Sequence, residues 1–174
     1  PVVDPEFVEE AFPEGEPVTL SFSLPAEART KALDENGTLD TLHIAVFGSS
    51  GYLKEYVKAE DRGAGTATTY TDPYGNTRDN VPVRNFAVTL TLSEKPRILH
   101  FIGNGPTTLP FDADTTIMAT LMSESGGQGF WQVKRVNSIG AKKENGHYVR
   151  DAYGNYIADQ AIQDSLTLVP LIRN

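Results

Sequence analysis

The chain has 174 residues, of which 39% are hydrophobic and 22% charged, and its formal net charge at pH 7 is −8. This composition is ordinary for a soluble globular protein, and the length suits a single domain with a substantial core. The negative charge argues against binding to the phosphate backbone of a nucleic acid. The chain has no cysteine, which excludes disulfides and cysteine-based metal or nucleophile chemistry.

Residues 1–16 are acidic and contain three prolines without a sustained hydrophobic period. We expect them to form a flexible, extended tether in front of a β-sandwich domain at residues 17–174. No apolar run has the length of a transmembrane helix, and the first residue is proline rather than methionine. We therefore expect that a leader was removed, either a secretory or lipoprotein leader or a segment trimmed for expression.

Residues 18–24 alternate strictly between apolar and polar side chains, and the apolar ones are Val18, Leu20, Phe22 and Leu24. Because strand side chains point alternately to two faces, this period of two predicts a half-buried strand. Prolines at both ends are typical of an edge strand. The small-residue stretch that follows carries no strand signal, so we expect residues 26–33 to form a mobile, protease-accessible loop.

The burial of these four side chains has a predictable size. At roughly 1.5–3 kcal/mol each they contribute about 6–12 kcal/mol as an upper bound, which equals the net stability of a typical domain. Losing the strand would leave an apolar groove, and the domain would either unfold or accept a strand from another molecule. The simpler interpretation is the first strand of a sandwich that never leaves.

Other strands are predicted along the chain. Residues 42–47 and 98–102 are apolar on both faces, so we expect both to lie in the interior of a sheet. The first of these should form a hairpin with residues 52–59. Further strands are expected at 83–92, 130–136, 148–157 and 166–172.

Two turns and one helix complete the predicted elements. A small hairpin is expected around residues 72–76, whose pattern Asp-x-Tyr-Gly-Asn recurs at 151–155 and predicts a similar turn there. A single helix is predicted at 113–124. Its apolar face contains Ile117, Met118, Leu121 and Met122.

The sequence contains no recognised catalytic or metal-binding motif. His43 and His100 lie in apolar, strand-like runs, where a core histidine is commoner than a ligand. The aspartates at 72–80 match no calcium loop, so a solvated turn is the preferred interpretation. Trp131 could stack on a sugar, although a place in the core is favoured for a lone tryptophan. We therefore expect no enzymatic activity, no cofactor and no metal.

Several stretches resemble the fimbrillin-like surface proteins of Bacteroidia, which are the subunits of type V pili and their accessory tip and anchor proteins. The stretches are the strand at 18–24 with Pro25 and Arg29, the strand at 42–47, residues 97–104, and residues 121–131 with the final Leu-Ile-Arg-Asn. The resemblance implies an all-β, transthyretin-like Greek-key β-sandwich of about seven strands, here with one short helical insertion. The matching stretches span nearly the whole chain.

The same resemblance implies a route of assembly. Members of that family are secreted as lipoproteins, an arginine-specific protease cuts after the first strand, and the C-terminal strand of a neighbouring subunit fills the groove. By position, Arg29 resembles that cleavage site. The strand that would be displaced carries Val18, Leu20, Phe22 and Leu24. The lipid-bearing cysteine and a second domain after residue 174 are absent, so we expect the N-terminal domain of a longer subunit. Anchor subunits in that family keep their first strand.

The sequence thus predicts a non-enzymatic fimbrial or cell-adhesion protein at the outer membrane, with other pilus subunits and a host or bacterial surface ligand as partners. The alternative is a surface glycan-binding module of the same fold. In that case Trp131, or the tyrosines of the turns at 72–76 and 151–155, would form a sugar platform. An exposed Trp131 would favour the glycan-binding module, whereas a buried one would favour the pilus subunit.

Overall fold

A computed structural model describes residues 9–25, 29–30, 40–71, 75–108, 130–165 and 172–173. In these ranges almost all regular structure is strand, and the helix is α2 (Gln160–Ser165). The strands are β1 (Pro17–Pro25), β2 (Arg29–Thr30), β3 (Leu42–Gly48), β4 (Leu53–Lys58), β5 (Glu60–Ala64), β6 (Thr68–Thr71), β7 (Thr77–Val81), β8 (Val83–Thr91), β9 (Arg97–Gly103), β10 (Phe130–Val136), β11 (Lys143–Glu144), β12 (His147–Tyr148), β13 (Tyr156–Ile157) and β14 (Ile172–Arg173). The predicted all-β class is confirmed.

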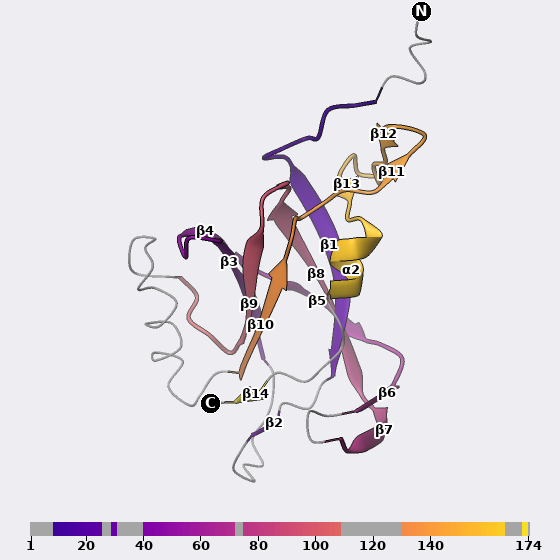
Figure 1. Cartoon of the computed structure of the whole chain (residues 1–174). Helices are drawn as coiled ribbons and strands as arrows, with labels where there is room; N and C mark the ends of the chain where they lie inside the picture. Colours follow the sequence, from indigo (N-terminus) through magenta and orange to yellow (C-terminus); the bar gives the residue numbers. More distant parts are fainter. Residues whose placement is uncertain are drawn as a thin grey trace, which may run out of the picture.

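Two sheets form the body of the protein (Figure 1). Within the described residues the smaller sheet has four strands in the order β13-β1-β8-β5, and the larger has six in the order β2-β14-β10-β9-β3-β4. Their facing sides share one apolar core, to which Leu20 and Val88 contribute from the smaller sheet and Ile44 and Phe101 from the larger. Because each sheet buries one face against the other, the protein is a β-sandwich.

The two strands with apolar residues on both faces lie in the interior of the larger sheet, as predicted. Strand β9 lies between β10 and β3, and β3 lies between β9 and β4. All seven residues of β3 are buried, as are six of the seven in β9. Alternate residues of these strands face away from the sandwich core and are still buried, which explains why the sequence shows no polar face there.

The predicted hairpins are also present. Strands β3 and β4 pair in antiparallel fashion from His43 opposite Lys58 to Phe47 opposite Leu53. Strands β6 and β7 form a separate hairpin around residues 72–76, of which 72–74 lie outside the described residues. A bridge between Arg150 and Tyr156 closes the turn at 151–155.

The C-terminal third departs from the sequence prediction. The strand expected at 148–157 is divided into β12 and β13, because the turn at 151–155 reverses the chain between them. Helix α2 was not predicted. The carboxylate of Asp159 caps it by accepting a hydrogen bond from the backbone N–H of Ile162 at 2.9 Å, and Ile162 is buried in the core. The helix predicted at 113–124 and residues 166–171 of the last predicted strand lie outside the described residues.

Residues 9–16 lie against the domain, whereas the sequence predicted a flexible tether at residues 1–16. The backbone N–H of Glu10 donates to the carbonyl of Gly146 at 3.0 Å, and that of Gly15 donates to the carbonyl of Leu92 at 3.0 Å. The ring of Phe12 packs edge-on against Tyr148 with centroids 6.1 Å apart. The packed part of the chain therefore begins before residue 17, while residues 1–8 lie outside the described residues.

Candidate functional site

Strand β1 buries the four apolar side chains that the sequence alternation singled out. Their exposed fractions are 0% for Val18, 0% for Leu20, 8% for Phe22 and 4% for Leu24. The ring of Phe22 stacks on Phe86 of β8 at 5.9 Å and meets Phe101 of the opposite sheet edge-on at 5.6 Å. The half-buried strand is confirmed, and its apolar face is an integral part of the core.

The two edges of β1 are paired very differently. On one side the whole strand pairs with β8 in antiparallel register, from Pro17 opposite Thr91 to Pro25 opposite Val83. On the other side, within the described residues, β13 pairs only with Val18 and Thr19. Helix α2 lies alongside part of β1 in Figure 1.

A side-chain hydrogen bond links α2 to this edge of β1. The amide Nε2 of Gln163 donates to the carbonyl oxygen of Ser21 at 2.7 Å. Within the described residues, β1 is therefore an edge strand over most of its length. Its removal would break one full ladder and only two residues of a second, and would open the core on that side.

Arg29 lies at the start of β2, which is at one edge of the larger sheet within the described residues. Its backbone pairs in parallel with β14, with Arg29 opposite Ile172 and Thr30 opposite Arg173. Residues 26–28 and 31–39 lie outside the described residues, as does the side chain of Arg29. Part of the expected loop is thus a two-residue strand at a sheet edge, and cleavage at Arg29 stays a prediction.

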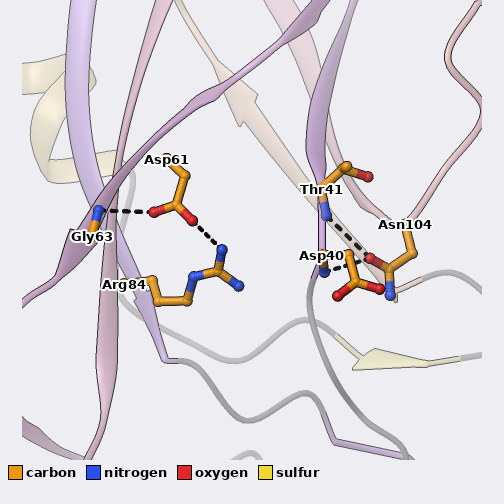
Figure 2. A network of polar contacts seen from close by, with 6 residues as sticks. All are labelled: Asp40, Thr41, Asp61, Gly63, Arg84 and Asn104. Carbon is orange, nitrogen blue, oxygen red and sulfur yellow. Dashed lines mark hydrogen bonds and ion pairs between the residues drawn. The ribbon is translucent and has the colours of Figure 1, made fainter.

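An ion pair supports the sheet where β1 ends (Figure 2). The guanidinium of Arg84, which lies opposite Leu24 in the ladder, donates to the carboxylate of Asp61 on β5. The same carboxylate accepts the backbone N–H of Gly63 at 2.8 Å. The hydrogen bond from Arg84, followed by that from Gly63, lowers the pKa of Asp61. Asp61 therefore stays ionised and joins β5 to β8 beside the end of β1.

A second polar contact holds the chain where it enters β3 (Figure 2). The side-chain Oδ1 of Asn104 accepts the backbone N–H groups of Asp40 at 2.7 Å and of Thr41 at 3.2 Å. Asn104 has a φ of 54°, in the left-handed region that asparagine tolerates better than most residues. The turn after β9 thus holds the backbone of Asp40 and Thr41 directly before β3.

The residues before β1 form an additional attachment. Glu9 pairs with Lys143 at 3.3 Å, and Glu10 lies 3.0 Å from the ring Nδ1 of His147. Glu14 accepts the backbone N–H of Glu94 at 2.9 Å, and this hydrogen bond is the main cause of its lowered pKa. Because this segment is continuous with β1, a cut after Arg29 would release both together only if all of these contacts broke.

The sugar platform considered from the sequence is only partly described. Trp131 lies in β10, where its backbone pairs with Ile102 of β9 and Ile172 of β14, but its side chain lies outside the described residues. Tyr74 also lies outside them. The tyrosine of the second turn, Tyr153, is 90% exposed.

The two strand histidines are buried, with exposed fractions of 4% for His43 and 0% for His100, but they lie on the face of the larger sheet that points away from the sandwich core. His43 is stacked on Tyr56 at 4.9 Å, and His100 meets Phe47 edge-on at 5.0 Å. Burial, with a smaller contribution from Arg135, lowers the pKa of His100 to about 4. Burial also lowers the pKa of His43. Both rings are therefore neutral at pH 7.

Within the ranges that the structure describes, no group of three His, Asp or Glu side chains is placed to bind a metal ion. The same ranges contain no helix of the length and apolarity needed to span a membrane. Comparisons with protein-family models, with curated proteins and with solved structures find no match to this chain. The function of the chain is therefore inferred from the geometry of β1 and of the surfaces around it.

Proposed function

We propose that this chain is a non-enzymatic fimbrial or pilus subunit, or an accessory cell-adhesion protein, that assembles by donor-strand exchange. The observation that carries the proposal is β1, which has four buried apolar side chains and one complete ladder, and whose other edge is paired only at Val18 and Thr19 within the described residues. A strand of this kind can be replaced by another that pairs with β8, and of the described strands only β13 must also pair anew. The proposal includes a transthyretin-like Greek-key topology and attachment to the outer membrane as a lipoprotein.

In this proposal the incoming strand replaces β1 against β8. It needs apolar side chains at every second position, to fill the places of Val18, Leu20, Phe22 and Leu24. Its backbone must supply the hydrogen bonds that β8 now makes with β1 from residue 83 to residue 91. Unpaired backbone groups on β8 would be costly, which favours complete occupation of the groove.

The exchange would be started by hydrolysis of the peptide bond after Arg29. The cut would separate β1 from the rest of the chain covalently but not physically, because its buried face contributes up to about 6–12 kcal/mol. Exchange would therefore be slow or assisted. The parallel pairing of Arg29 with Ile172 must open before cleavage, since a protease needs several residues in an accessible, extended form.

The direct test compares the wild type with Arg29→Ala in the presence of an arginine-specific protease and a labelled peptide copying residues 17–25. We expect cleavage and incorporation of the peptide in the wild type and neither in the variant. The stability of Arg29→Ala should differ from that of the wild type by no more than about 0.5 kcal/mol, as is usual for surface substitutions.

Arg62→Ala is the matched control, because Arg62 lies on the exposed strand β5. It should incorporate the peptide as the wild type does. Equal incorporation in wild type and Arg29→Ala would refute the role of Arg29, and so would cleavage of the wild type only at another arginine. An anchor subunit that keeps its first strand would then be the better interpretation.

A further inference from the structure

The outer face of the smaller sheet contains a groove of about 790 Å³, on the side opposite the core. Ser21 of β1, Ala87 of β8 and Glu60 of β5 form one row across its floor, because they are paired in register. The turn at 151–155 forms one wall, with Tyr153 lining the groove. The volume lies within the range of about 300–1,000 Å³ that is usual for small-molecule sites.

The strands β1 and β8 contribute several uncharged polar side chains to the floor of this groove. These are short hydroxyl and amide side chains, namely Thr19, Ser21, Ser23, Asn85 and Thr89. The hydroxyl of Ser23 donates to Oδ1 of Asn85 at 2.5 Å, which orients both groups. Hydroxyl and amide groups can both donate and accept hydrogen bonds, and this is the chemistry needed to bind the hydroxyls of a sugar.

The charged residues of the groove balance one another. Lys58 and Arg62 are basic, whereas Glu60 and Asp151 are acidic. Arg62 pairs with Glu60 at 3.2 Å. The groove therefore presents no excess of either sign, and the chain as a whole is acidic with a net charge of −8. Polyanions such as sulfated glycans are disfavoured, and a neutral ligand is favoured.

Hydrogen bonds hold the backbone at Tyr153, although the residue is 90% exposed. The carboxylate Oδ1 of Asp151 accepts the backbone N–H groups of Tyr153 at 2.8 Å and of Asn155 at 3.0 Å. Gly154 has a φ of 83°, which glycine adopts at no steric cost. The guanidinium of Arg150 donates to the carbonyl of Gly154 at 2.9 Å. These contacts fix the backbone that carries Tyr153, and an exposed aromatic ring contributes little to the core but is typical of binding surfaces.

We propose that this groove binds a short, neutral oligosaccharide, with the ring of Tyr153 stacked on one sugar face and the hydroxyl and amide groups of the floor bonded to sugar hydroxyls. This site lies in β1, β5, β8 and the 151–155 turn, and not at Trp131. It goes beyond strand exchange and does not depend on it. Because β1 forms part of the floor, the site requires a chain in which β1 is in place.

The test uses the intact, uncleaved chain. It is titrated at millimolar concentration with the tetrasaccharides of maltose, cellulose and mannan, and with a heparin tetrasaccharide as the anionic comparison, while backbone amide resonances are recorded. We expect at least one neutral probe to shift the amides of Tyr153 and Asn85. Tyr153→Ala should weaken this binding about tenfold, while Tyr153→Phe should retain it, because the ring and not the hydroxyl provides the stacking surface.

Tyr52→Ala is the matched control, since Tyr52 is exposed but does not line the groove. It should bind as the wild type does. Ala87→Leu places a larger side chain on the floor and should abolish binding, with amide spectra verifying that the variant is folded.

Three results of the binding titrations would overturn the proposal. They are no binding to any neutral probe, binding that Tyr52→Ala weakens as much as Tyr153→Ala, and a preference for the heparin probe that Arg62→Ala removes. A concentration-dependent dimer that Tyr153→Ala disrupts would assign the groove to a second copy of the chain, which also contradicts it. Failure of peptide incorporation after protease treatment would leave this proposal unaffected, because no step of it requires cleavage.

Discussion

His100 couples the stability of the fold to pH. Its ring is completely buried, and its pKa is about 4, against the ordinary value of 6.5. As the pH falls below 6.5, the unfolded chain binds a proton that the folded chain does not bind until about pH 4. The stabilisation is therefore complete above pH 6.5 and is lost towards pH 4, by roughly 3 kcal/mol at about 1.4 kcal/mol per pH unit.

The measurement is urea denaturation of the wild type and His100→Phe at about pH 7 and about pH 4.5. Phenylalanine fills the space without titrating, so the variant should lose less stability between the two pH values. Carboxylates contribute equally to both proteins and cancel in the comparison. The same loss in both proteins would show that His100 is not the group that couples stability to pH.

Phe12 should stabilise the domain, although it lies in the acidic N-terminal segment. Its ring is partly buried against Tyr148 and the core. We expect Phe12→Ala to lower the free energy of unfolding by about 1–2 kcal/mol, less than for a fully buried phenylalanine. Tyr52→Ala removes an exposed ring and should cost no more than about 0.5 kcal/mol. Equal effects in urea denaturation would mean that residues 9–16 form the tether expected from the sequence.

The two faces of β1 should respond very differently to substitution. Leu20 is fully buried, whereas its neighbour Ser21 is exposed on the other face. Leu20→Ala should cost about 2–5 kcal/mol because it leaves a cavity in the core, and Ser21→Ala should cost no more than about 0.5 kcal/mol. Urea denaturation of both variants measures the difference. Similar costs would show that the strand contributes little to the core and would weaken the case for strand exchange.

The elements whose hydrophobic period is local were predictable from the sequence. The alternation at 18–24 indicates a strand with one buried face. The continuous apolar runs at 42–47 and 98–102 indicate strands with two buried faces. Helix α2 was missed because six residues make less than two turns, too short to show a helical period. Its only strong signal is the capping residue Asp159.

The parts that depend on contacts between distant residues were not predictable. The composition of residues 9–16 indicates a tether, but their partners Leu92 and Gly146 are far away in the sequence. The groove on the smaller sheet also depends on contacts between residues that are distant in the sequence. The sequence singled out Tyr153 as a possible sugar-platform residue, but not its neighbours: it lines one groove with Ser21 because β13 pairs with β1 and β1 with β8.

At the scale of the whole molecule, a chain cut after Arg29 should remain one particle. The released segment would still contain all of β1 paired with β8, and Phe12 packed against Tyr148. Association of two separate pieces costs about 4–15 kcal/mol in lost translational and rotational freedom, and we expect the buried face of β1, its ladder to β8 and the contacts of residues 9–16 together to exceed that cost. We expect the two pieces to co-elute in size-exclusion chromatography without denaturant and to separate in urea.

The variant Leu20→Ala in the same cut chain tests how much the buried face of β1 contributes to holding the two pieces together. A loss of about 2–5 kcal/mol raises the dissociation constant of the segment by at least about thirtyfold, since each 1.4 kcal/mol is a factor of ten. The cut variant should therefore lose its N-terminal segment during chromatography and incorporate a peptide copying residues 17–25 faster than the cut wild type. Ser21→Ala should behave as the wild type does in both assays. Immediate loss of the segment from the cut wild type would mean that burial of β1 does not hold it. Exchange would then need no assistance, contrary to what the four buried side chains lead us to expect.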